Sequence, residues 1–197
     1  MSKIPEGATP VGEDDRDGLI SSGVKTREQL NALEFSNISE AALKYLASPP
    51  SEKKAPFTAL WLKELHREMF GAVWKWAGQF RTTELSVGVP VYTVSQEIKQ
   101  FEGDYQTWIK EKIRESEIEA RIHHKLVWIH PFRNGNGRWA RLAVNIFLMQ
   151  KQKHLILWPE DEIFIGKTFR REYIKALQAA DQGDIRKLTA LQEKLQA

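Results

Sequence analysis

Cysteine is absent from this sequence of 197 residues, and the acidic and basic side chains nearly balance, leaving a net charge of +3. Without cysteine the chain can form no disulfide, no thiolate metal site and no cysteine nucleophile, which fits a reducing cytoplasm. The small net charge does not by itself indicate binding to nucleic acid. A long hydrophobic run is also missing, because the most apolar stretch, Leu142–Met149, is interrupted by Asn145 and is too short to cross a bilayer.

The N-terminal residues Met1–Gly7 contain no apolar segment of the kind that a signal peptide needs. We therefore expect a soluble cytoplasmic protein that binds neither membranes nor, directly, nucleic acid. The composition, 42% hydrophobic and 28% charged residues, is that of a globular protein. The length suits one domain with a buried core.

Apolar residues at helical spacing dominate the rest of the chain, so we predict an all-α fold. Its predicted parts are an irregular N-terminal arm (1–25), an N-terminal helical segment (26–47), a linker (48–56) and a helical core domain (57–197). The helical segment begins with a capping box at Thr26–Gln29. The linker is indicated by its Pro and Ser residues.

Two segments of the predicted core domain have distinct patterns. Leu142–Leu148 is apolar nearly all round, which predicts a helix at the centre of a bundle. Thr83–Thr93 instead alternates apolar and other residues around a Gly and a Pro, which predicts a small β-hairpin. Its apolar positions are Leu85, Val87, Val89 and Val91.

The stretch His130–Arg141 reads His-Pro-Phe-Arg-Asn-Gly-Asn-Gly-Arg-Trp-Ala-Arg. Its glycines allow backbone N–H groups to turn toward an anion, and its arginines offer permanently charged donors to phosphate oxygens. Its histidine can take a proton near neutral pH. Together these residue types indicate a site for a polyphosphate next to a base.

These residues resemble the signature of the Fic domain family, His-x-Phe-x-(Asp/Glu)-Gly-Asn-Gly-Arg-x-x-Arg. Trp76–Arg81 is similar to the Trp-Ala-Gly-x-x-Arg segments that precede the signature in many Fic proteins. The resemblance implies the Fic fold, a helical bundle around a central buried helix with a small β-hairpin. One position departs from the pattern, because Asn134 stands where most family members carry Asp or Glu.

The resemblance also implies an enzyme, a protein adenylyltransferase that moves AMP from ATP to a Ser, Thr or Tyr hydroxyl of a target protein. His130 would be its catalytic base. The nucleotide would be bound by five other signature residues: Gly135, Asn136, Gly137, Arg138 and Arg141. We expect the remaining histidines to be structural: His66, His123, His124 and His154.

Mg²⁺ is the expected cofactor, because the charge on phosphoryl oxygens calls for a cation in the site. Asn134 would be a weak metal ligand, since an amide offers a neutral oxygen in place of a charged one. Two alternatives follow. Relatives of the Doc type are kinases that transfer the γ-phosphate, although their loops usually read Ala-Asn-Lys-Arg where this chain has Gly-Asn-Gly-Arg. A decayed metal site would instead leave a non-catalytic module that binds nucleotide or a partner.

Many Fic proteins are inhibited by a helix with the pattern Ser/Thr-x-x-x-Glu-Gly/Asn, whose Glu pairs with the second arginine of the signature. Ser36–Ala41 matches this pattern except in its last position, and a spacing of four places Ser36 and Glu40 on one face of a helix. We therefore predict that Glu40 pairs with Arg141 and inhibits the enzyme. Glu193, near the C-terminus, is the rival candidate.

Two further implications come from the resemblance. In Fic proteins the hairpin is a flap that pairs with the backbone of the target, which implies this role for the predicted hairpin; strand addition at an exposed edge is physically reasonable. The segments Gly18–Ile20 and Thr26–Asn31 also resemble the Fic subfamily called mobile mystery protein B. Its members are encoded beside a helix-turn-helix partner, which implies a bacterial origin, such a partner protein and a toxin-antitoxin role.

Overall fold

The computed structural model describes residues 18–20, 23–24, 26–164 and 167–196, so most of the predicted N-terminal arm lies outside the described residues. The described part is helical, which confirms the all-α prediction. Its helices are α2 (Arg27–Leu46), α3 (Ala59–Phe70), η1 (Val91–Thr93), α4 (Val94–Lys110), α5 (Glu115–Ile129), α6 (Asn136–Gln150), α7 (Glu160–Phe164), α8 (Lys167–Asp181) and α9 (Arg186–Leu195). In the same residues, β-type pairing is limited to the isolated bridges Leu19–Trp74 and Ile156–Gln196.

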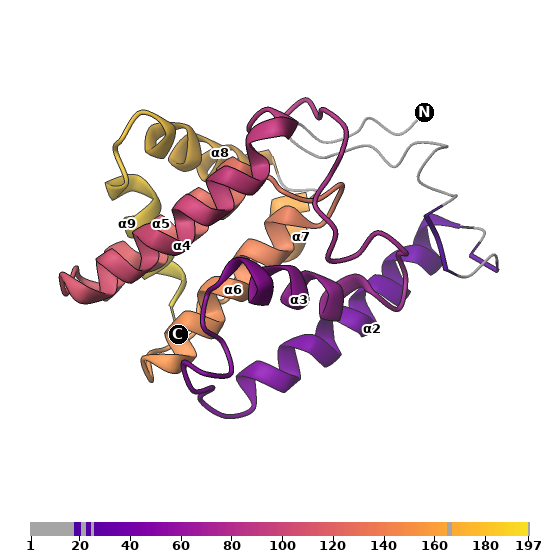
Figure 1. The fold of residues 1–197 in the computed structure, drawn as a ribbon, viewed down its shortest axis with the longest axis horizontal. Helices are drawn as coiled ribbons and strands as arrows, with labels where there is room; N and C mark the ends of the chain where they lie inside the picture. Colours follow the sequence, from indigo (N-terminus) through magenta and orange to yellow (C-terminus); the bar gives the residue numbers. More distant parts are fainter. Residues whose placement is uncertain (1–17, 21–22, 25, 165–166, 197) are drawn as a thin grey trace.

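Helix α6 is the centre of the fold. Figure 1 shows it in the middle of the molecule, with α2 and α3 on one side and α4, α5, α8 and α9 on the other. Its residues Trp139, Ala143 and Phe147 have no exposed surface. The apolar character that the sequence has around the whole helix is therefore explained by neighbours on every side.

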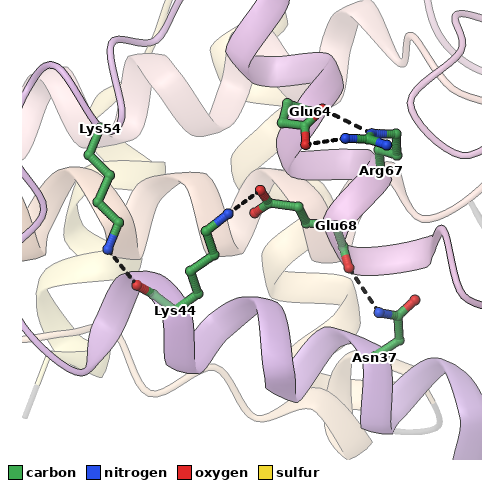
Figure 2. Close-up of polar contacts among 6 residues, drawn as sticks. All are labelled: Asn37, Lys44, Lys54, Glu64, Arg67 and Glu68. Atoms are coloured by element: carbon green, nitrogen blue, oxygen red, sulfur yellow. Dashed lines mark hydrogen bonds and ion pairs between the residues drawn. The ribbon is translucent and has the colours of Figure 1, made fainter.

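Helix α2 begins with the predicted capping box, in which the Thr26 side chain accepts from the backbone N–H of Gln29. Polar contacts tie it to α3 (Figure 2): Asn37 donates to the Glu68 carbonyl at 2.9 Å, and Lys44 pairs with the Glu68 carboxylate. Exposed ion pairs contribute only about 0–1 kcal/mol. Burial of Leu30, Ala41 and Tyr45 is thus the main force that docks α2.

The predicted linker 48–56 does not separate two hydrophobic cores. Leu30 and Tyr45 of α2 belong to the same buried cluster as Phe57 and Trp61, which follow the connection. Gln150, at the end of α6, donates to the Ala55 carbonyl at 2.8 Å and so fixes the connection against the domain. The N-terminal helical segment is therefore an integral layer of the fold.

None of the helices in the described part of the chain is both long and apolar enough to cross a bilayer.

Candidate active site

The signature residues form the turn between α5 and α6, and the side chain of Asn136 shapes that turn. Its Oδ1 accepts from the Phe132 N–H at 2.9 Å, and its Nδ2 donates to the Phe132 carbonyl at 2.8 Å. The Phe132 ring is fully buried, where it packs against His66 and Trp139. The Asn136 side chain therefore fixes the backbone of the loop at Phe132. The sequence motif alone did not predict this structural role.

Gly135 is the N-cap of α6 and has a left-handed backbone with φ +79. A Cβ at this position would lie 2.5 Å from the ring of Phe70, so a side chain has no room. Among the described residues no side chain caps the N-terminus of α6. The first N–H groups of the helix, at Asn136 and Gly137, then point toward an anion site at the positive end of the helix dipole.

His130 ends α5 in the left-handed conformation, with φ 51 and ψ 58. A non-glycine residue held in this region costs about 1–3 kcal/mol, so surrounding contacts must stabilise it. Its Nδ1 lies 3.2 Å from the Val127 carbonyl. Because a carbonyl can only accept, Nδ1 carries the proton and Nε2 carries the lone pair.

The electrostatics of His130 favour the neutral base. Burial lowers its pKa to about 4; the charge of Arg81 acts in the same direction, and the hydrogen bond to Val127 opposes both. At neutral pH the ring is therefore uncharged and able to accept a proton. His130 lines a cavity of about 660 Å³, a volume typical of small-molecule sites.

His66, on α3, is buried beneath the signature loop and hydrogen-bonds to it. Its Nδ1 accepts from the Gly78 N–H at 3.0 Å, so its Nε2 donates to the Asn134 carbonyl, also at 3.0 Å. Its ring stacks on Phe132 with centroids 3.7 Å apart. The expectation that His66 is structural fits this position, but its link to the loop was missed, because the partners are distant in sequence.

Buried histidines give the protein a defined pH dependence of stability. Burial lowers the pKa of His66 to about 3 and that of His130 to about 4, and it lowers the pKa of His123 well below 6.5. Below about pH 6.5 the unfolded chain takes up protons that the folded chain excludes, so stability falls by more than about 1 kcal/mol per pH unit for each histidine until its folded pKa is reached. Glu119, whose pKa burial raises to about 7, acts in the opposite direction.

We expect His66→Gln to flatten this dependence, because a glutamine amide can accept from Gly78 and donate to the Asn134 carbonyl but does not titrate. The measurement is urea unfolding of both proteins between about pH 6.5 and pH 5. The loss of stability of the variant over this range should be smaller by more than about 1 kcal/mol per pH unit. Parallel curves for the two proteins would contradict the neutral, buried state of His66.

Both signature arginines are paired with carboxylates. Arg138 donates to Glu34 of α2 at 2.7 Å, and Glu34, which is 5% exposed, also accepts from the Trp74 indole at 2.7 Å. Arg141 is buried and binds Glu160 of α7 through two nitrogens, at 2.8 and 2.5 Å. Charged, bidentate pairs of this kind are among the stronger hydrogen bonds. Sequence reasoning found neither acid.

The predicted pair between Glu40 and Arg141 is not formed. Ser36 and Glu40 are exposed, and the acid of α2 that reaches the signature is Glu34. Glu40 lies six residues after Glu34, which places it about 9 Å further along the helix axis and rotated by about 120° around it. The two side chains therefore point in different directions. Glu193 is also exposed, on α9, where its negative charge helps to raise the pKa of the buried Glu119.

The predicted hairpin at Thr83–Thr93 is wrong, because this segment forms bends and the short helix η1 instead of strands. Its carbonyls at Thr83 and Val89 accept from the Arg81 guanidinium rather than from a partner strand. Pro90 also removes a donor that a ladder would use.

The four apolar positions of this segment do not share one environment. Val89 is buried, whereas Leu85, Val87 and Val91 are half-buried. Val87 and Gly88 line the cavity beside His130. The segment therefore lies beside the site, where a flap is expected, but it is a loop and not a hairpin.

Asn134 lies at the mouth of the loop, where its Oδ1 accepts from the Gly135 N–H at 2.7 Å. Its amide oxygen is thus already engaged within the turn. In the described ranges no group of three or more His, Asp or Glu side chains is arranged to hold a metal ion.

The lining of the cavity combines two groups of residues. One group is the loop residues Gly135–Arg138 together with Arg141. The other group comes from α5 and α8 and mixes apolar with polar side chains, among them Val127, Trp128, Ile174, Leu177, Gln178 and Asp181. Fold and cavity together define a helical protein that can hold a phosphorylated ligand beside a neutral histidine.

Comparison with known proteins identifies this class further. Residues 56–148 match the model of the Fic/DOC family, and the chain belongs to that family. The protein adenylyltransferase Fic of Aedes aegypti is 32% identical over 152 residues, which cover 75% of this chain and 29% of the relative. The chain spans about a third of the length of the curated relatives it matches.

Solved structures agree in fold. Fic-1 from Caenorhabditis elegans has a TM-score of 0.67 and 29% identity, and the match covers 90% of this chain and 51% of that one. BepC from Bartonella tribocorum, solved with bound AMPPNP, has a TM-score of 0.67 over 94% of this chain and 99% of its own, at 21% identity. At that identity the likeness is one of fold alone. Since animal and bacterial proteins both occur among these matches, they do not support a specifically bacterial origin.

Proposed function

We propose that this protein transfers AMP from ATP to a hydroxyl group of a target protein. The observation that carries the proposal is the neutral His130, whose Nε2 is available as a base beside the anion-binding N-terminus of α6. Relatives that are about 30% identical are named protein adenylyltransferases, which supports the same reaction here. The retained Gly-Asn-Gly-Arg sequence favours AMP transfer over the Doc-like kinase reaction.

The two groups of lining residues suggest how ATP would lie. Its phosphates would meet the N–H groups of Asn136 and Gly137 at the start of α6, with Arg141 reaching the distal phosphate. The nucleobase would lie against the residues of α5 and α8. There Trp128 and Leu177 offer surfaces for stacking and packing, and Gln178 and Asp181 offer polar atoms to the edge of the base.

The proposed step follows from the tautomer of His130. Its Nε2 accepts the proton of the target hydroxyl while the hydroxyl oxygen forms a bond to the α-phosphorus. The bond between the α-phosphorus and the oxygen that bridges to the β-phosphate breaks, and pyrophosphate leaves. The N–H groups at the start of α6 and the guanidinium of Arg138 would stabilise the charge that develops on the phosphoryl oxygens.

Mg²⁺ would supply positive charge to the phosphates when bound. The residues present fit such an ion only in a limited way, since Asn134 offers one neutral oxygen that already accepts from Gly135. The ion would therefore take most of its ligands from phosphates and water. Asn134 would add an amide ligand after giving up its contact within the turn.

We also propose that the enzyme is restrained by α2, with Glu34 in the role that the sequence suggested for Glu40. Glu34 neutralises Arg138 and occupies the guanidinium that the phosphates would use. Glu160 occupies Arg141 in the same way from the other side of the site. ATP must therefore displace carboxylates before both arginines can bind it.

The target protein would approach over residues 83–90. Ser86, Val87 and Gly88 border the cavity at His130, and Ser86 and Gly88 are exposed. This loop, rather than a hairpin edge, would register the hydroxyl. A helix-turn-helix partner and a toxin-antitoxin role remain predictions from the N-terminal sequence.

The test uses ATP labelled at either the α- or the γ-phosphate, added to the wild-type protein and to a Glu34→Gly variant. We expect label on protein from the α-position only. Label from the γ-position only would identify a Doc-like kinase. Absence of both labels from both proteins would identify a non-catalytic module and contradict the proposal.

A further inference from the structure

Arg81 is a buried cation that the proposed reaction does not yet use. It ends the Trp76–Arg81 stretch, and its side chain has no exposed surface. The nearest carboxylate, Glu84, lies 3.6 Å away and is itself 60% exposed. A buried charge must be satisfied by its surroundings. The groups that accept hydrogen bonds from this guanidinium therefore show which parts of the backbone it fixes.

The partners of Arg81 are backbone carbonyls on two separate segments. Its Nε donates to the His130 carbonyl at 2.8 Å, and its backbone N–H donates to the Pro131 carbonyl at 2.8 Å. The other two guanidinium nitrogens donate to the carbonyls of Thr83, at 3.1 Å, and Val89. One side chain thus joins the turn that contains His130 to both ends of the loop that borders it.

This junction fixes two features that need support. His130 has a left-handed backbone, and Arg81 donates hydrogen bonds to the carbonyls of His130 and of the next residue, Pro131. Gly88, with φ +95, approaches His130 so closely that a Cβ would lie 2.6 Å from the His130 Cβ. The planar fork of an arginine can hold several carbonyls in fixed relative positions, which a lysine cannot.

We propose that Arg81 is a positioning residue that sets the distance between the loop 83–89 and His130, so that a hydroxyl brought by the loop meets the base in register. This inference rests on the proposed function for the identity of the hydroxyl and the base. The coupling of loop and histidine rests on the hydrogen bonds alone. The two can therefore be tested separately.

The first variant is Arg81→Lys, which keeps the positive charge and loses the fork. A misplacement of about 1 Å can cost about 10²-fold in rate, so we expect self-labelling from α-labelled ATP, at saturating ATP, to fall by about 10²-fold. The KM for ATP should stay nearly unchanged, because the phosphate loop is not touched. A rise in KM at an unchanged rate would overturn the proposal.

Gly88→Ala provides a second variant in case the lysine variant does not fold. It leaves Arg81 in place and forces the loop and His130 apart through the added methyl group. The same loss of rate is expected. Arg67→Lys is the matched control, because Arg67 is an exposed arginine that pairs with Glu64 on α3 (Figure 2), and the parent rate should be kept.

NMR spectra of the same proteins test the coupling without measuring activity. If Arg81 couples the two segments, the signals of His130 and of residues 83–89 shift and gain fast mobility together in Arg81→Lys, while those of α8 and α9 stay in place. Loop signals that change while those of His130 do not would overturn the coupling. If the signals move together but neither the parent protein nor its Glu34→Gly variant transfers AMP, the proposed function fails and the coupling of the loop to His130 stands.

Discussion

Replacing His130 by alanine should lower the rate of AMP transfer by about 10²–10⁴-fold, the usual contribution of a general base. ATP binding should be nearly unchanged, because in the proposed site the N–H groups of α6 and the signature arginines, not His130, would hold the phosphates. The change removes the Nε2 lone pair that the contact of Nδ1 with Val127 leaves available. The measurement combines labelling from α-labelled ATP with calorimetric binding of ATP.

His154→Ala is the matched control, because His154 is exposed and lies outside the cavity lining. It should label at the parent rate. If the His130 variant also labels at that rate, His130 is not the base. If it loses ATP binding as well, the effect is on the loop and not on the chemistry.

Replacing Glu34 by glycine should raise the rate of labelling by up to about 100-fold. A restrained state that is 99% populated needs an advantage of only about 2.7 kcal/mol, within reach of one buried pair together with the docking of α2. Removing the acid takes away the carboxylate that pairs with Arg138, and a phosphate can then take the place of that carboxylate. The thermal midpoint should fall, because the Trp74 indole also loses its acceptor.

Glu40→Gly is the control for Glu34→Gly. It has the same cost of placing glycine in a helix, about 1 kcal/mol, but it keeps the Glu34 carboxylate. Both substitutions lie inside α2, but Glu40 is exposed. Only the Glu34 variant should be activated. Activation by Glu40→Gly alone would restore the assignment made from the sequence, and activation by Glu193→Gly alone would move the restraint to α9.

The sequence was sufficient for features that are local. The capping box that begins at Thr26 and the all-round apolar character of α6 are set by neighbours a few residues apart, and the structure contains both. The signature predicts an anion-binding loop on equally local grounds, because both of its glycines and Arg138 lie within one turn of a helix start.

The contacts that complete the site could not be predicted, because they join distant positions. Glu34 meets Arg138 across 104 residues, and His66 meets the Asn134 carbonyl across 68. No spacing rule connects such pairs. The hairpin failed for a related reason, since alternation of apolar residues does not reveal that a buried arginine will take the carbonyls a strand would need.

The carboxylates on the two signature arginines come from opposite sides of the signature in the chain. Glu34 precedes it on α2, and Glu160 follows it on α7. If each acid competes with phosphate, substitutions in either helix change how often the site is open without altering any residue that handles ATP. The output of the enzyme can then be adjusted in small steps during evolution while its chemistry is preserved.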